Sequence, residues 1–126
     1  MTKDSIAHVH MLCEEWMREL AFYKSEIPYL RKRLEEIASK NTSADIMKEV
    51  DHYENKFKIQ STHIDELIHD VKLKNENLLK EAAAKPNYIN VKMIEADHNL
   101  LDLMSDTSSD FYETKSSFYK FLSRTL

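Results

Sequence analysis

The sequence contains no glycine in its 126 residues, and this absence excludes several structural devices together. Glycine permits left-handed turns, β-bulges, many tight hairpins and the loops that cradle phosphate groups. A phosphate loop, a dinucleotide-binding fingerprint and a glycine-flanked nucleophile elbow are therefore excluded. The chain is expected to consist of helices joined by short turns.

Cysteine and long apolar runs are also scarce. The single cysteine, Cys13, cannot form an internal disulfide, and its core-type spacing between Val9 and Trp16 predicts a buried structural thiol. The longest purely apolar run is about four residues, which is too short for a membrane span. The first sixteen residues lack the apolar stretch of a secretory signal. We therefore expect a cytoplasmic protein that does not enter membranes.

The charge balance argues against nucleic acid as a partner. The 18 basic and 22 acidic residues give a net charge of −4, whereas binding to phosphates requires a basic face. Charged residues nevertheless make up 32% of the chain beside 42% hydrophobic ones, which suits slender helices with solvated outer faces.

An unbroken heptad pattern is the strongest feature that is present. From Ile6 to Ile37 apolar residues recur at alternating steps of three and four, which predicts one long helix packed against partner helices. The residues are Ile6, Val9, Cys13, Trp16, Leu20, Tyr23, Ile27, Leu30, Leu34 and Ile37. We expect Trp16 to be buried.

Two polar breaks divide the chain into three nearly equal segments. The breaks at 39–43 and 85–87 predict helices over about 5–39, 43–84 and 87–124. Short turns between equal helices favour an all-α, antiparallel three-helix bundle with coiled-coil-like packing, forming one domain over 1–126. The seam passes Pro28 in phase, so we expect a kinked but continuous first helix, with Ser25 satisfying a freed backbone group.

The later helices have less regular cores. Gln60 and Lys74 fall at core-type positions of the second helix. For the third helix, the spacing predicts Leu101, Ser108 and Leu122 in the core, together with Ile94, Met104, Phe111 and Phe118. The weak helix formers at 105–110 leave open an alternative in which this helix splits and forms a four-helix bundle.

A repeated Glu-x-x-His spacing is the main candidate for metal chemistry. Residues three apart share a helix face, and such pairs hold metal ions in the core of some helical bundles. The pairs are Glu49/His52, Glu66/His69 and Glu95/His98. Glu66 and His69 should face water at 100° per residue, and Glu95 lies at the core boundary. We therefore predict no metal ligands or cofactor, with Glu95, His98, Glu66 and His69 as the candidates for an alternative metal- or ligand-binding function.

Aromatic residues outside the core are the remaining functional signal. Phe22 and Tyr29 lie one heptad apart on the outer face of the first helix, and Tyr112 and Tyr119 widen the apolar stripe of the third. Ile59 and Leu73 form a similar outward pair on the second helix. Helix-to-helix contacts use such spacing. We predict a non-enzymatic protein-interaction or scaffold module, self-associating or bound to a protein partner, with Phe22 and Tyr29 as its interaction surface and no catalytic residues.

Two segments resemble known sequences. The stretch WMRELAFYKSEIPYLRKRLEEIASKNT from Trp16, and IQSTHIDELIHDV from Ile59, are similar to small uncharacterised all-helical bacterial proteins. The resemblance implies a helical fold in a bacterial cytoplasm and no particular function.

Overall fold

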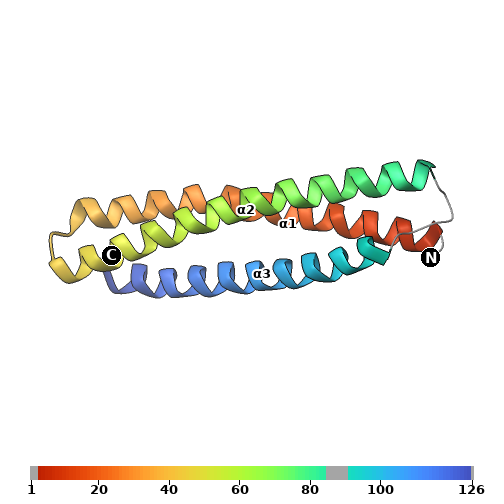
Figure 1. Ribbon diagram of the computed structural model, residues 1–126. Coiled ribbons are helices and arrows are strands. Elements are labelled where there is room, and N and C mark those ends of the chain that lie inside the picture. The colour runs from red at the N-terminus through yellow and green to blue at the C-terminus, as the bar shows by residue number, and fades with distance from the viewer. Residues whose placement is uncertain (1–2, 85–90, 126) are drawn as a thin grey trace.

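The computed structural model describes residues 3–84 and 91–125, which form three long helices (Figure 1). The helices are α1 (Lys3–Lys40), α2 (Ala44–Ala84) and α3 (Val91–Thr125), and the described residues contain no strand. The predicted all-α three-helix bundle is confirmed. The predicted break at 85–87 lies outside the described residues.

The helices run up, down and up (Figure 1). Along the pair α1–α2, Lys24 binds Asp65 while Arg31 binds Glu54, so numbers rise in one helix as they fall in the other. Helices α1 and α3 run in the same direction, since Tyr23 contacts Ser108 and Glu26 contacts Lys115. Helices α1 and α2 approach each other more closely than either approaches α3.

The core follows the predicted seam in α1 and α2. All of the seam residues from Val9 to Ile37 are buried, including Trp16. In α2, Gln60 and Lys74 are buried as their spacing predicts. A cluster of rings closes the space between α2 and α3 near the end of α3, and its members are Tyr53, Phe57, Phe118 and Phe121.

The predicted core of α3 is correct at Met104, Phe111 and Phe118 and wrong at three other positions, while the side chain of Ile94 lies outside the described residues. Leu101 is exposed and Ser108 and Leu122 are only half-buried, whereas Leu100, Thr107 and Phe121 are buried in their place. Thr107 can occupy the core because its hydroxyl donates to the Leu103 carbonyl at 2.7 Å while its methyl group packs inside. The buried stripe is therefore continuous, but it includes two threonines, Thr107 and Thr114.

Helices α1 and α3 are both continuous through their doubtful segments. Helix α3 passes through 105–110 without a break, so the four-helix alternative is wrong. Helix α1 contains Pro28, which lies on its exposed side. Ser25 donates to the carbonyl of Phe22 at 2.7 Å, not to that of Lys24, which Pro28 leaves without its helical donor. The predicted role of Ser25 is therefore wrong.

Within residues 3–84 and 91–125, none of the three helices is both long enough and apolar enough to cross a membrane.

Candidate functional site

Four aromatic rings from α1 and α3 gather on one side of the bundle. Phe22 and Tyr29 of α1 are 45% and 51% exposed, and Tyr112 and Tyr119 of α3 are 51% and 46% exposed. The edge of Phe22 meets Phe111 at 6.4 Å between ring centres, and Tyr112 meets Tyr23 at 5.9 Å. Phe22 of α1 thus packs against α3 and Tyr112 of α3 packs against α1, whereas Tyr29 contacts Arg33 of its own helix. We call these four rings together with Lys115 the aromatic face.

Lys115 ties the two helices together at the centre of the aromatic face. Its ammonium group donates to Glu26 of α1 at 2.7 Å and lies 5.9 Å from the ring centre of Phe22 and 5.7 Å from that of Tyr119. The hydrogen bond with Glu26 raises the pKa of Lys115 above its ordinary value. The cation is therefore held in place by one carboxylate and two rings, an arrangement in which all three contacts are favourable.

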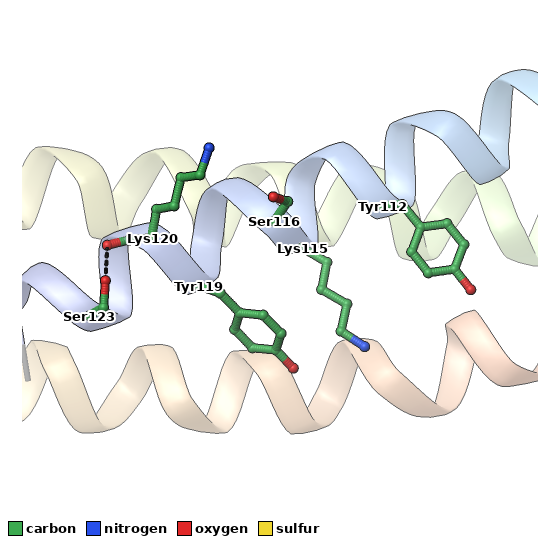
Figure 2. A pocket seen from close by; sticks show the side chains of 6 residues that line it. All are labelled: Tyr112, Lys115, Ser116, Tyr119, Lys120 and Ser123. Carbon is green, nitrogen blue, oxygen red and sulfur yellow. Dashed lines mark hydrogen bonds between the residues drawn. The ribbon is translucent and has the colours of Figure 1, made fainter.

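A shallow hollow of about 480 Å³ lies on the α3 side of this face. Its lining includes Tyr112, Lys115, Ser116, Tyr119, Lys120 and Ser123. Figure 2 shows Tyr112, Lys115 and Tyr119 pointing from α3 over α1, while Lys120 points away from α1. A second hollow of about 440 Å³ continues onto the outer side of α3 beside Glu113 and Lys120. Ser116 and Ser117 also line this second hollow, and their small side chains leave room for another helix to approach α3 closely.

The metal candidates whose side chains are described lie on the surface of α2. Glu66 and His69 lie on the exposed outer side of α2, as their direction predicts. Glu95 and His98 belong to α3, but their side chains lie outside the described part of the structure. Glu49 binds Arg124 at 3.2 Å, and His52 is exposed beside the Tyr53 ring. Among the described residues, no group of three or more histidine, cysteine or carboxylate side chains could hold a metal ion.

A thiol and an amine, those of Cys13 and Lys74, lie near each other in the interior. Both are buried between α1 and α2. Burial raises the pKa of the Cys13 thiol, and the nearby charge of Lys74 only partly opposes this. Burial also lowers the pKa of Lys74. A thiol with a raised pKa is a poor nucleophile, which agrees with the predicted structural role of Cys13.

A layer of polar contacts joins α2 to α3, and only Gln60 among its members was singled out by its spacing in the sequence. The Gln60 amide nitrogen donates to the Asp110 carboxylate at 2.8 Å and to the Thr114 hydroxyl at 3.0 Å. His63 contacts Thr107 at 3.1 Å. Burial opposes ionisation of Asp110, but hydrogen bonds from Lys56 and Gln60 outweigh it and lower the pKa of this carboxyl. These contacts link the two helices.

The outward pair on α2 offers less than the aromatic face. Ile59 and Leu73 are exposed as predicted, and Ile59 lines a shallow hollow of about 580 Å³ with Lys58, Thr62, His63 and Glu66. The two apolar side chains are four turns apart. Among the described residues, no phenylalanine, tyrosine or tryptophan lines this hollow.

Comparisons of the chain with protein-family models, with curated proteins and with solved structures give no match. The function must therefore be argued from the surface itself.

Proposed function

We propose that the protein is a non-enzymatic interaction or scaffold module of the cytoplasm, which self-associates or binds a protein partner through the aromatic face. The observation that carries the proposal is the set of four half-exposed rings on two helices, of which Phe22 and Tyr119 lie against Lys115. Rings of this kind cover about 150–250 Å² each, so roughly 300–500 Å² of aromatic surface remains open. Patches of that size on a monomer are commonly functional.

The shape of the face favours a protein over a small molecule. Small-molecule sites are concave and enclose most of the ligand surface. The hollow beside Tyr112 and Tyr119 is shallow, and exposed side chains line most of it. Tyrosine, with an apolar ring and a polar hydroxyl, is enriched where two protein surfaces meet and separate. A helical partner could place apolar side chains between these rings.

The experiment compares two matched double variants. Phe22→Ser with Tyr29→Ser changes the aromatic face, and Ile59→Ser with Leu73→Ser changes the outward pair of α2. All four side chains are exposed, so circular dichroism should show unchanged helicity in both variants. Light scattering of purified protein, and crosslinking in native cells, should show a species heavier than the monomer for the wild type and the α2 variant, but a weakened one for the face variant. A monomer with no crosslinked partner in the wild type would refute the proposal.

The alternative, a metal- or ligand-binding bundle, receives less support. Glu66 and His69 point to solvent from one helix, whereas a metal site in a bundle draws its ligands inward from several helices. Elemental analysis of protein from native cells decides between the two. Stoichiometric iron, manganese or zinc that is lost in His98→Ala would favour the alternative.

A further inference from the structure

The charges of α1 and α3 are segregated along the bundle. Residues 99–113 of α3 contain four acidic residues and no basic one, and residues 114–125 contain three basic residues and no acidic one. In α1, residues 7–22 contain three acidic residues and one basic, and residues 23–40 contain three acidic and five basic. Because α1 and α3 run in the same direction, the two acidic halves share one end of the bundle and the two basic halves share the other.

Helix α2 does not share this polarity. Residues 44–64 contain four acidic and three basic residues, and residues 65–84 contain five acidic and three basic. The segregation therefore belongs to the side of the molecule that carries the aromatic face. The net charge changes from negative to positive between Phe22 and Lys24 on α1 and between Glu113 and Lys115 on α3. Two rings of the aromatic face therefore lie on each side of this change.

The exposed charges of α3 are arranged symmetrically about Glu113. Asp102 and Asp106 lie eleven and seven residues before Glu113, and Lys120 and Arg124 lie seven and eleven residues after it. All five side chains are exposed. Asp102, Asp106 and Lys120 form no ion pair with any described residue, and Arg124 reaches Glu49 only at the surface. A second α3 laid antiparallel with Glu113 at the crossing point would place Lys120 opposite Asp106 and Arg124 opposite Asp102, while the two Glu113 side chains would meet each other.

We propose that the aromatic face and the adjoining outer side of α3 bind a second copy of this chain, antiparallel to the first, across a two-fold axis at the level of Glu113. This inference rests on the proposed interaction function and specifies its partner. Such an axis makes every contact twice, so Asp106 faces Lys120 and Asp102 faces Arg124 in both directions. The acidic half of each copy then covers the basic half of the other, whereas a parallel pair would place like charges together.

The serines and rings of α3 fit the same arrangement. Ser109 and Ser116 lie nearly equally far from Glu113 on its two sides, and both are exposed. Small side chains at the crossing point allow the two helices to approach, so Tyr112 and Tyr119 can reach the surface of the second copy. The open aromatic surface of roughly 300–500 Å² supplies about half of the 800 Å² that each partner contributes to a standard interface.

Charge exchange tests the pairing. Asp106→Lys alone, or Lys120→Asp alone, places two like-charged pairs in the interface and should weaken the dimer about tenfold, because each exposed pair contributes modestly. The variant with both changes restores opposite charges in the antiparallel arrangement and should return the dissociation constant, measured by analytical ultracentrifugation at low salt, to within about threefold of the wild type. A double variant as weak as the single ones would overturn the antiparallel pairing.

Crosslinking tests the axis directly. Glu113→Cys should form an interchain disulfide under mild oxidation, since this position meets its own copy, while Ser123→Cys should not. Links at both positions would indicate a parallel dimer, which overturns this inference and leaves the proposed function intact. A monomer that forms neither link but binds a different protein, and loses that partner when Phe22 and Tyr29 become serine, would overturn the inference that the partner is a second copy. It would leave the proposed function intact. A monomer without any partner would overturn both.

Discussion

Replacing Pro28 by alanine should stabilise the bundle. Pro28 lies on the exposed side of a continuous helix, between Ile27 and the fully buried Leu30. It has no amide hydrogen, so the carbonyl of Lys24 lacks its helical donor, and the proline ring crowds that same carbonyl. Ser25 does not compensate, because its hydroxyl donates to the carbonyl of Phe22 at 2.7 Å.

The expected gain follows from two opposing terms. A proline inside a helix costs about 3 kcal/mol relative to alanine. Proline also restricts the unfolded chain. Removing that restriction stabilises the unfolded state by about 0.4–1 kcal/mol, which reduces the gain. The free energy of unfolding should therefore rise by about 2 kcal/mol. For a chain of this length such a gain corresponds to a melting temperature higher by about 6–10 °C.

Urea unfolding followed by circular dichroism measures the change, with the slope of free energy against urea as a check on the unfolded state. Ser25→Ala is the matched control, because it removes an exposed local bond and should alter stability by no more than about 0.5 kcal/mol. If Pro28→Ala lowers stability, the bend that proline imposes is needed to seat Ile27 and Leu30, and the reasoning from the missing hydrogen bond is refuted.

Three further outcomes are expected. Phe118→Ala should cost about 3–5 kcal/mol in urea unfolding because its ring is fully buried among Tyr53 and Phe57, whereas a cost below about 1 kcal/mol would mean the ring cluster is not packed as described. Glu26→Gln should lower stability by less than about 1 kcal/mol at pH 7. Because Glu26 raises the pKa of Lys115 above 10.5, this loss should be present in full below pH 10.5 and disappear as the pH rises through the folded pKa, and a loss that stays constant in alkaline urea titrations would contradict the pairing. Cys13 should react with a thiol reagent only as fast as the protein opens, since it is buried and its pKa is raised, so rapid labelling of the native protein would show an open path to it.

The sequence predicts the buried positions of α1 and α2 well because one mostly apolar stripe repeats along each helix and no second stripe competes with it. In α3 two stripes overlap, and both include Met104, Phe111 and Phe118. Counting apolar residues does not separate them, because one stripe adds Leu101 and Leu122 to the shared three and the other adds Leu100 and Phe121. The structure buries the stripe that also includes Thr107 and Thr114. A threonine whose hydroxyl is bonded behaves as a core residue, and spacing alone does not reveal that bond.

The aromatic face was only half predictable for a related reason. Spacing identifies Phe22 with Tyr29 as an outward pair on α1, and Tyr112 with Tyr119 as residues that widen the apolar stripe of α3. Whether the two pairs share one side of the bundle depends on how α1 and α3 are rotated about their axes, which only packing decides. The contacts of Lys115 with Glu26 and Phe22 show which side of α3 faces α1. No pattern within one helix contains it.

The polar layer between α2 and α3 connects the fold to the proposed pairing of two copies. If α3 slipped by one heptad, Gln60 and Asp110 would lose their hydrogen bond inside the bundle, and buried polar groups without partners are costly. Polar side chains at core positions fix helix register in this way. The same slip would shift the charge reversal at Glu113 away from the reversal between Phe22 and Lys24 on α1. The buried contacts of Gln60 therefore keep the two charge reversals at one level, with one ring of each helix on either side of it, which is the condition that a two-fold partner requires.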